Sequence, residues 1–224
     1  MRLLHLQLFD YRNFHRLDLP LPAGPALFIG DNAQGKTNLL EAVHLLATMR
    51  VLRAETDAQL IRRQSLDDVL PAARLVAQAE TLAGPLKLEV AVVARPGAQG
   101  PIATKTVRVN GVPRRLSDAV GRFLAVLFSP DDLDLVSGPP SLRRQFLDIT
   151  LSQVEPAYAA ARHRFERVLL QRNHLLKSMR ERGARPEELA FWDEQLSNDG
   201  GLLFHQRARA SQEQDGLAGE AHRS

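Results

Sequence analysis

The sequence predicts an α/β protein whose first part is rich in strands and whose second part is helical. Three observations predict this class. Apolar and polar residues alternate through much of the segment from residue 2 to residue 116. A glycine-rich loop separates a short apolar run from a segment with helical periodicity, and the run from Pro156 to Arg182 has no glycine and no further proline.

The N-terminal leucines predict the first elements. Their alternation over residues 2–21 indicates two half-buried strands, joined by a polar turn at residues 10–13. The apolar run at residues 25–29 is typical of a buried strand, and residues 36–49 place apolar side chains at helical spacing. The predicted order is therefore two strands, a third strand, a glycine loop and a helix.

The middle of the chain returns to strands. Residues 74–80 and 86–94 predict a hairpin, and residues 104–109 pair through an Asn-Gly turn with residues 112–116. A short helix starting at Ser117 and a buried strand at residues 124–128 are expected next. Residues 50–74 give no clear pattern.

Helices are predicted for the rest of the chain. One begins near Ser141, a second follows Pro156 and would reach about 40 Å as a straight helix, and a shorter one begins near Glu187. The polar end of the chain predicts a disordered tail. We therefore expect a first lobe at 1–129, a helical second lobe at 130–200, and a disordered or altered tail at 201–224.

Composition excludes several classes of function. The chain has 224 residues, of which 44% are hydrophobic and 25% charged, and it has no cysteine. Disulfide scaffolds, thiolate zinc sites and cysteine nucleophiles are excluded. With no long apolar segment, we expect a cytoplasmic protein without a membrane partner. The net charge of +3 is too small to indicate nucleic-acid binding unless the charge is unevenly distributed.

A phosphate-loop motif carries the strongest chemical signal. Two glycines with four residues between them are followed by Lys and Thr, after an apolar run and before a helix. Backbone N–H groups of such a loop surround phosphate oxygens, the lysine reaches the β- and γ-phosphates, and the threonine hydroxyl binds Mg²⁺. The residues are Gly30, Asp31, Asn32, Ala33, Gln34, Gly35, Lys36 and Thr37.

Hydrolysis of a nucleotide needs more than this loop. It also needs an acidic residue for Mg²⁺ and a group that orients water. No run of four apolar residues followed by an acidic pair occurs after Lys36. No catalytic residue is therefore predicted.

The predicted long helix concentrates positive charge. Residues 156–182 contain seven basic and two acidic residues, a local charge of +5. Such a stripe is suited to contacts with a phosphodiester backbone, but a solvated helix face explains it equally well. His163 and His174 in this helix lack the spacing of metal ligands. The candidates for DNA contacts are Arg162, Arg164, Arg167, Arg172 and Lys177.

Several segments together resemble the RecF family of DNA-repair proteins, in the ATP-binding-cassette group that includes SMC and Rad50. They are LHLQLFDYRNF, GDNAQGKTNLLEAVHLLATMR, VLRAETDAQLIRR, VLFSPDDLDLVSGPPSLRRQFLDI, AARHRFERVLLQRNHLLK and FWDEQL, within residues 2–196. The most specific is FSPDDL followed by SLRRQFLD. The resemblance implies a phosphate-loop ATPase head, with a mixed sheet around a central helix and a helical lobe with coiled-coil-like helices.

The resemblance also implies function and partners. It implies ATP and Mg²⁺ as cofactors, a homodimer that forms with ATP, and binding to single-stranded, gapped or junction DNA. The partner would be RecR, with RecO and RecA loading downstream and a role in the SOS response. Arg12 and Asn13 would lie beside the nucleotide, and no catalytic role is transferred to the FSPDDL segment.

The chain departs from the family in length. RecF proteins continue well beyond it, and their second half supplies the signature motif, the acidic motif and returning strands of the first lobe. We therefore expect exposed apolar surface and no hydrolysis here, although a longer family member would be a weak ATPase. The alternatives are an adaptor that holds nucleotide without turnover, and an unrelated phosphate-loop kinase or GTPase.

Overall fold

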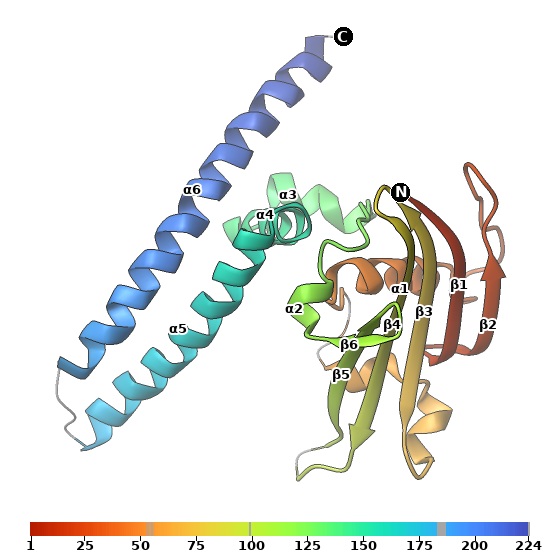
Figure 1. Cartoon of the computed structure of the whole chain (residues 1–224), viewed down its shortest axis with the longest axis horizontal. Helices are drawn as coiled ribbons and strands as arrows, with labels where there is room; N and C mark the ends of the chain where they lie inside the picture. The colour runs from red at the N-terminus through yellow and green to blue at the C-terminus, as the bar shows by residue number, and fades with distance from the viewer. Residues whose placement is uncertain (53, 55, 99, 183–186, 224) are drawn as a thin grey trace. The chain divides into compact units, whose positions relative to one another are not determined.

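The computed structural model describes the chain except residues 53, 55, 99, 183–186 and 224 (Figure 1). It divides into two compact units, Met1–Ser129 and Pro130–Ser224. Each unit has its own apolar core.

The first unit is built on a six-stranded sheet with the order β2-β1-β3-β4-β5-β6, in which neighbouring strands are antiparallel. Leu6 lies opposite Leu19 on one side and Ala77 on the other, so the alternating leucines share one face. The predicted strands at the N-terminus and in the middle of the chain are confirmed. The strands are β1 (Arg2–Tyr11), β2 (Phe14–Pro20), β3 (Ala72–Thr81), β4 (Gly84–Arg95), β5 (Ile102–Val109) and β6 (Val112–Arg114).

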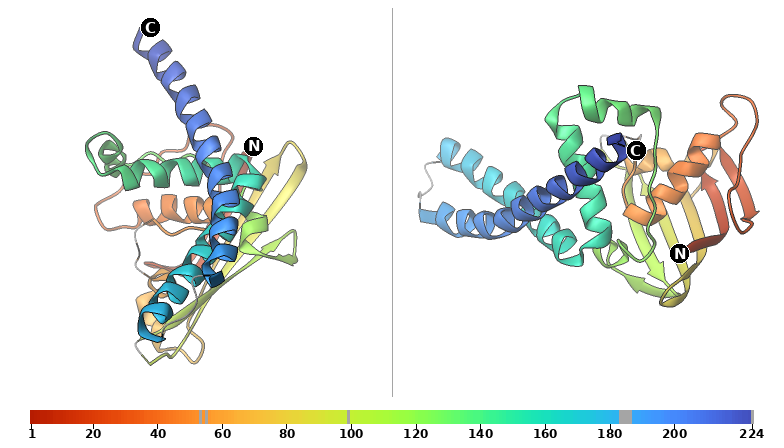
Figure 2. Two further views of the ribbon diagram at one scale, coloured as in Figure 1. Left: turned by 90° about the vertical axis from the view of Figure 1, so that its left-hand side faces the viewer. Right: turned by 90° about the horizontal axis from the view of Figure 1, so that it is seen from above.

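Helix α1 (Lys36–Thr48) packs against the apolar face of this sheet (Figure 2). Leu39, Leu45 and Leu46 on α1 are buried in the same core as the strand leucines. The helix predicted after the glycine loop is therefore confirmed. Three short helices complete the unit: η1 (Asp57–Leu60), η2 (Arg63–Asp67) and α2 (Leu116–Ala119).

Three local predictions in this unit are wrong. Residues 25–29 and 124–128 form no strand, and Ile29 and Val126 are 87% and 99% exposed. An apolar run forms a strand only where another strand supplies hydrogen bonds, and neither segment lies beside a strand of the described sheet. The short helix starts at Leu116 rather than Ser117, and no side chain caps it.

The second unit is helical. Two long helices, α5 and α6, lie antiparallel along each other, and α4 packs against both (Figure 1). Their seam is closed by Tyr158, Ala161 and Leu203, which are at most 3% exposed. The elements are η3 (Pro130–Leu133), α3 (Asp134–Ser137), α4 (Pro140–Val154), α5 (Pro156–Arg182) and α6 (Glu187–Arg223).

The expected disordered tail from residue 201 is wrong, because α6 continues to Arg223. Leu203 is buried and Ala210 packs against the same cluster, so the core holds the helix well past the predicted boundary. Beyond Ala210 the side chains are mostly exposed. That segment is rich in Gln, Glu and Ala, which favour helix even where nothing packs against it.

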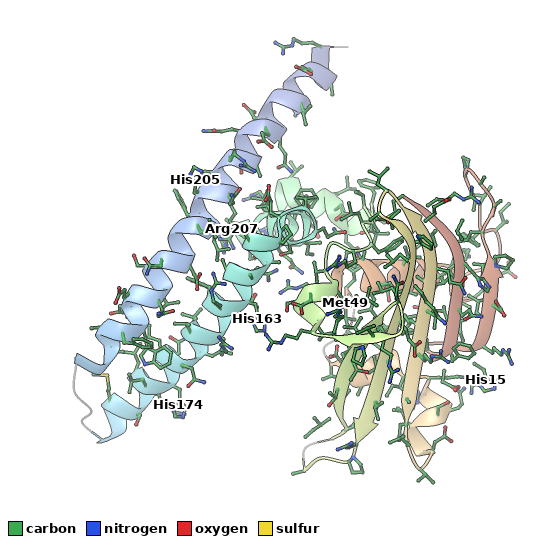
Figure 3. The ribbon with its side chains drawn as sticks, in the orientation of Figure 1. His15, Met49, His163, His174, His205 and Arg207 are labelled. Atoms are coloured by element: carbon green, nitrogen blue, oxygen red, sulfur yellow. The ribbon has the colours of Figure 1, made fainter. Side chains whose placement is uncertain are left out.

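A buried polar network joins α4, α5 and α6. Asp148 on α4 is 7% exposed and accepts hydrogen bonds from Tyr158 on α5 and from Arg207 on α6, the latter at 2.7 Å. Arg207 is labelled in Figure 3. Arg162 Nε lies 3.3 Å from Oδ2, the second carboxylate oxygen of Asp148. Burial and the Asp148 carboxylate raise the pKa of Tyr158 to about 12, so its hydroxyl remains a donor.

Replacing Asp148 should therefore destabilise the second unit. Asp148→Asn removes the negative charge and one of the two acceptor oxygens that two arginines and a tyrosine hydroxyl share, at a cost of about 3 kcal/mol. Hydrogen exchange should show faster opening of α5 and α6 amides and unchanged protection of β3 and β4. Asp215→Asn, at an exposed position of α6, is the matched control. Equal protection in the two variants would contradict the role of the network.

Candidate functional site

The glycine loop and the start of α1 form the candidate phosphate site. Residues 31–34 and Thr37 are exposed, and α1 begins at Lys36. Ala33 has φ +65° and Gly35 has φ +99°, so the backbone turns sharply before it enters the helix. Loops of this shape direct successive N–H groups and the positive end of the helix toward one point. That arrangement suits an anion with several oxygens.

Gly35 is required by both its conformation and its surroundings. Its φ lies in the left-handed region, which residues with a Cβ adopt at a cost. A Cβ at this position would lie 2.5 Å from Asn13 Nδ2 and 2.9 Å from Phe14 Cζ. The β1–β2 turn therefore approaches the loop as closely as glycine permits.

Asn13 holds the loop from this turn. Its Nδ2 donates to the carbonyl of Gln34 at 3.1 Å, and its Oδ1 accepts from Asn38 Nδ2 at 2.7 Å. One amide thus connects the last residues of the loop to the first turn of α1. The structure places Asn13 against the loop, and its place beside the nucleotide stays a prediction.

Arg12 has a different setting. Its backbone N–H donates to the Leu60 carbonyl at 2.8 Å, and its guanidinium donates to Glu41 at 3.1 Å and to the Gln59 carbonyl at 3.3 Å. Glu41 lies on α1 and is 7% exposed. Arg12 therefore ties the β1–β2 turn to α1.

Burial raises the pKa of the neighbouring Tyr11 to about 12.

Lys36 closes the loop with its side chain. Its Nζ donates to the carbonyls of Gly30 and Asp31, both at 2.6 Å. An ammonium has three donors, so these two bonds leave one for a phosphate oxygen. The Thr37 hydroxyl is in the exposed first turn of α1, where it could bind Mg²⁺ that accompanies a phosphate.

The five candidate DNA contacts differ in their surroundings. Three of them form ion pairs: Arg162 with Asp148 and Glu166, Arg164 with Asp199 at 2.7 Å, and Arg172 with Asp193. Arg167 and Lys177 are exposed and have no carboxylate partner among the described side chains. The sequence did not reveal this difference, because most of the paired acids lie on α4 and α6.

Asn38 and Glu41 support the candidate site through contacts that were not predicted from the sequence. They lie two and five residues after Lys36 on α1, and each contacts the β1–β2 turn. The sequence places both residues on the helix that follows the loop. It does not show that the β1–β2 turn lies against them. A buried glutamate opposite an arginine is visible only once the strands are placed.

The described residues contain neither a cluster typical of a metal site nor a helix that could span a membrane. Their His, Asp and Glu side chains form no cluster of three or more with the geometry of a metal site. None of the helices in this part of the chain is both long and apolar enough to cross a membrane.

Comparison with curated proteins identifies close relatives. The chain is 45% identical to the DNA replication and repair protein RecF of Chloroflexus aurantiacus, over 96% of the chain and 57% of that protein. It is 43% identical to RecF of Herpetosiphon aurantiacus, over 97% of the chain and 59% of that protein. The chain thus spans slightly more than half the length of these relatives. No protein-family profile matches it.

A solved structure has the same fold. The structure described as the recombination mediator protein RecF-ATP in the RecFOR pathway matches 94% of this chain and 54% of that chain. The TM-score is 0.79 and the sequence identity 29%. The expected α/β class is therefore confirmed. Together these matches show that the chain is homologous to the RecF family.

Proposed function

We propose that the chain is the nucleotide-binding and DNA-binding part of a RecF-type protein of recombinational repair and replication-gap processing. The observation that carries the proposal is the loop from Gly30 to Thr37, which is held by Asn13 and followed by the N-terminus of α1. The nucleotide is ATP, because the solved relative is described with ATP.

The residues present suit a magnesium nucleotide. Backbone N–H groups of residues 31–35 bind phosphate oxygens, Lys36 contributes the remaining N–H of its ammonium, and Thr37 provides a hydroxyl for Mg²⁺. When bound, Mg²⁺ neutralises charge on the phosphates. This chain binds and orients the nucleotide without turning it over, while weak hydrolysis belongs to a longer RecF protein.

The proposed setting is a cytoplasmic repair pathway. DNA with a single-stranded gap or a junction is the substrate, RecR is the direct partner, and RecO and RecA loading follow, with a contribution to the SOS response. Support comes from relatives named for replication and repair and from one described in the RecFOR pathway. A homodimer that forms with ATP would bring two such loops together.

Lys36→Ala should abolish saturable binding of a fluorescent ATP analogue in the presence of Mg²⁺. The substitution removes the charged side chain that closes the loop but no core packing. Circular dichroism should remain unchanged. Lys87→Ala, at an exposed position of β4, is the control and should bind as the wild type does. Undiminished binding by the Lys36 variant would remove the loop from the proposed function.

Asn13→Ala should weaken nucleotide binding without unfolding the sheet. It removes one hydrogen bond to the loop and one to α1, each contributing about 1 kcal/mol, so affinity should fall by up to about thirtyfold. Gln78→Ala, an exposed amide on β3, is the control. If both variants bind nucleotide equally well while the melting temperature of Asn13→Ala falls, Asn13 serves stability and does not position the loop.

A further inference from the structure

One face of α5 carries five exposed residues at alternating steps of four and three. They are His163, Arg167, Leu170, His174 and Lys177, called here the α5 stripe. We propose that the α5 stripe is the surface of the second unit that contacts the phosphodiester backbone of DNA. This inference rests on the proposed function, because it specifies where a RecF-type chain holds its DNA.

The spacing places the stripe on the side of α5 opposite its buried seam. Tyr158, Ala161 and Val168 face the core. The stripe residues repeat with the same helical period on the opposite side of α5. His163 and His174 both leave α5 on the side that does not face α6 (Figure 3). At 1.5 Å per residue the stripe is about 21 Å long, enough to contact several successive phosphates.

Charge separates the stripe from the other cations of α5. Arg164 and Arg172 are ion-paired with carboxylates of α6, and Arg162 with Asp148 and Glu166. Their charge is largely neutralised within the unit. Arg167 and Lys177 have no such partner among the described side chains, so their charge acts on the solvent.

Acidic residues are scarce around the stripe. Among the described side chains of α5, Glu166 is the single carboxylate, and it accepts a hydrogen bond from Arg162 at 2.8 Å. On α6, Asp193 and Asp199 are engaged by Arg172 and Arg164. The stripe therefore presents cations and imidazole N–H donors with little opposing charge, which suits phosphate oxygens.

The composition of the stripe disfavours a third helix as its occupant. A packed helix needs apolar residues at most positions of the seam, and Leu170 is the one apolar residue of five. A polyanion matches the other four positions. DNA is the favoured polyanion because the relatives are named for DNA replication and repair.

The test is a salt titration of oligothymidylate binding to the 224-residue chain and its variants, with affinity measured by fluorescence anisotropy. Arg167→Gln combined with Lys177→Gln removes two phosphate contacts. The slope of log affinity against log salt should become shallower by about 1.4, at about 0.7 for each contact to a single strand. Lys87→Gln combined with Arg108→Gln, exposed on β4 and β5, is the charge-matched control and should keep the wild-type slope.

A gain of contact provides an independent measurement. Leu170→Lys places a further cation in the middle of the stripe, and the slope should steepen by about 0.7. Its helix content, measured by circular dichroism, should be unchanged, because Leu170 is 69% exposed.

The outcomes separate the inference from the proposed function. An unchanged slope in the folded Arg167 and Lys177 double variant, or an equal loss in the control, overturns the α5 stripe as the DNA surface. The α5 stripe is also overturned as the DNA surface if the double variant keeps its full affinity for oligothymidylate and loses binding to polyglutamate, an acidic peptide. A wild-type chain that binds no oligonucleotide at any salt concentration instead overturns DNA binding by the chain.

Discussion

The close approach of the β1–β2 turn to Gly35 is the constraint on which the candidate site depends. A Cβ at Gly35 would lie 2.5 Å from Asn13 Nδ2, so a single backbone position sets the distance between the sheet and the loop. The turn is itself fixed, because Arg12 and Arg62 donate backbone hydrogen bonds to the carbonyls of Leu60 and Asp10. The phosphate loop is thus supported by close contacts and hydrogen bonds from other segments of the first unit.

In the second unit, ion pairing reduces the number of α5 cations that are available to contact DNA. Counting charges along α5 alone gives +5 over residues 156–182, and five cations qualify as DNA contacts. Once α4 and α6 are placed, three of them are engaged by carboxylates: Asp148 and Asp199, which are buried, and Asp193, which is exposed. Removing Arg164 would leave the buried Asp199 carboxylate without its arginine, and the loss of stability would obscure any effect on DNA binding.

Local pattern predicted much of the fold, and long-range pairing explains what it missed. Alternating leucines predicted β1 and β2, and Asn110-Gly111 predicted the β5–β6 turn, because side-chain period and turn chemistry are local properties. The apolar run at residues 25–29 also predicted a strand, but these residues do not pair with a strand and form none. For the site, the sequence located the loop and Lys36, whereas the bonds of Asn13 to Gln34 and of Arg12 to Glu41 required the three-dimensional arrangement.

The two proposed sites lie in units with separate cores, which constrains how they can influence each other. No residue of the cluster around α1 belongs to the cluster around Tyr158 and Leu203. A change of DNA affinity with nucleotide would therefore be a coupling free energy between separately packed units, and not the deformation of one shared core. Such coupling is reciprocal. DNA would have to strengthen nucleotide binding by the same factor by which nucleotide strengthens DNA binding. This reciprocity would hold although Lys36 lies on a helix of one core and the α5 stripe on a helix of the other.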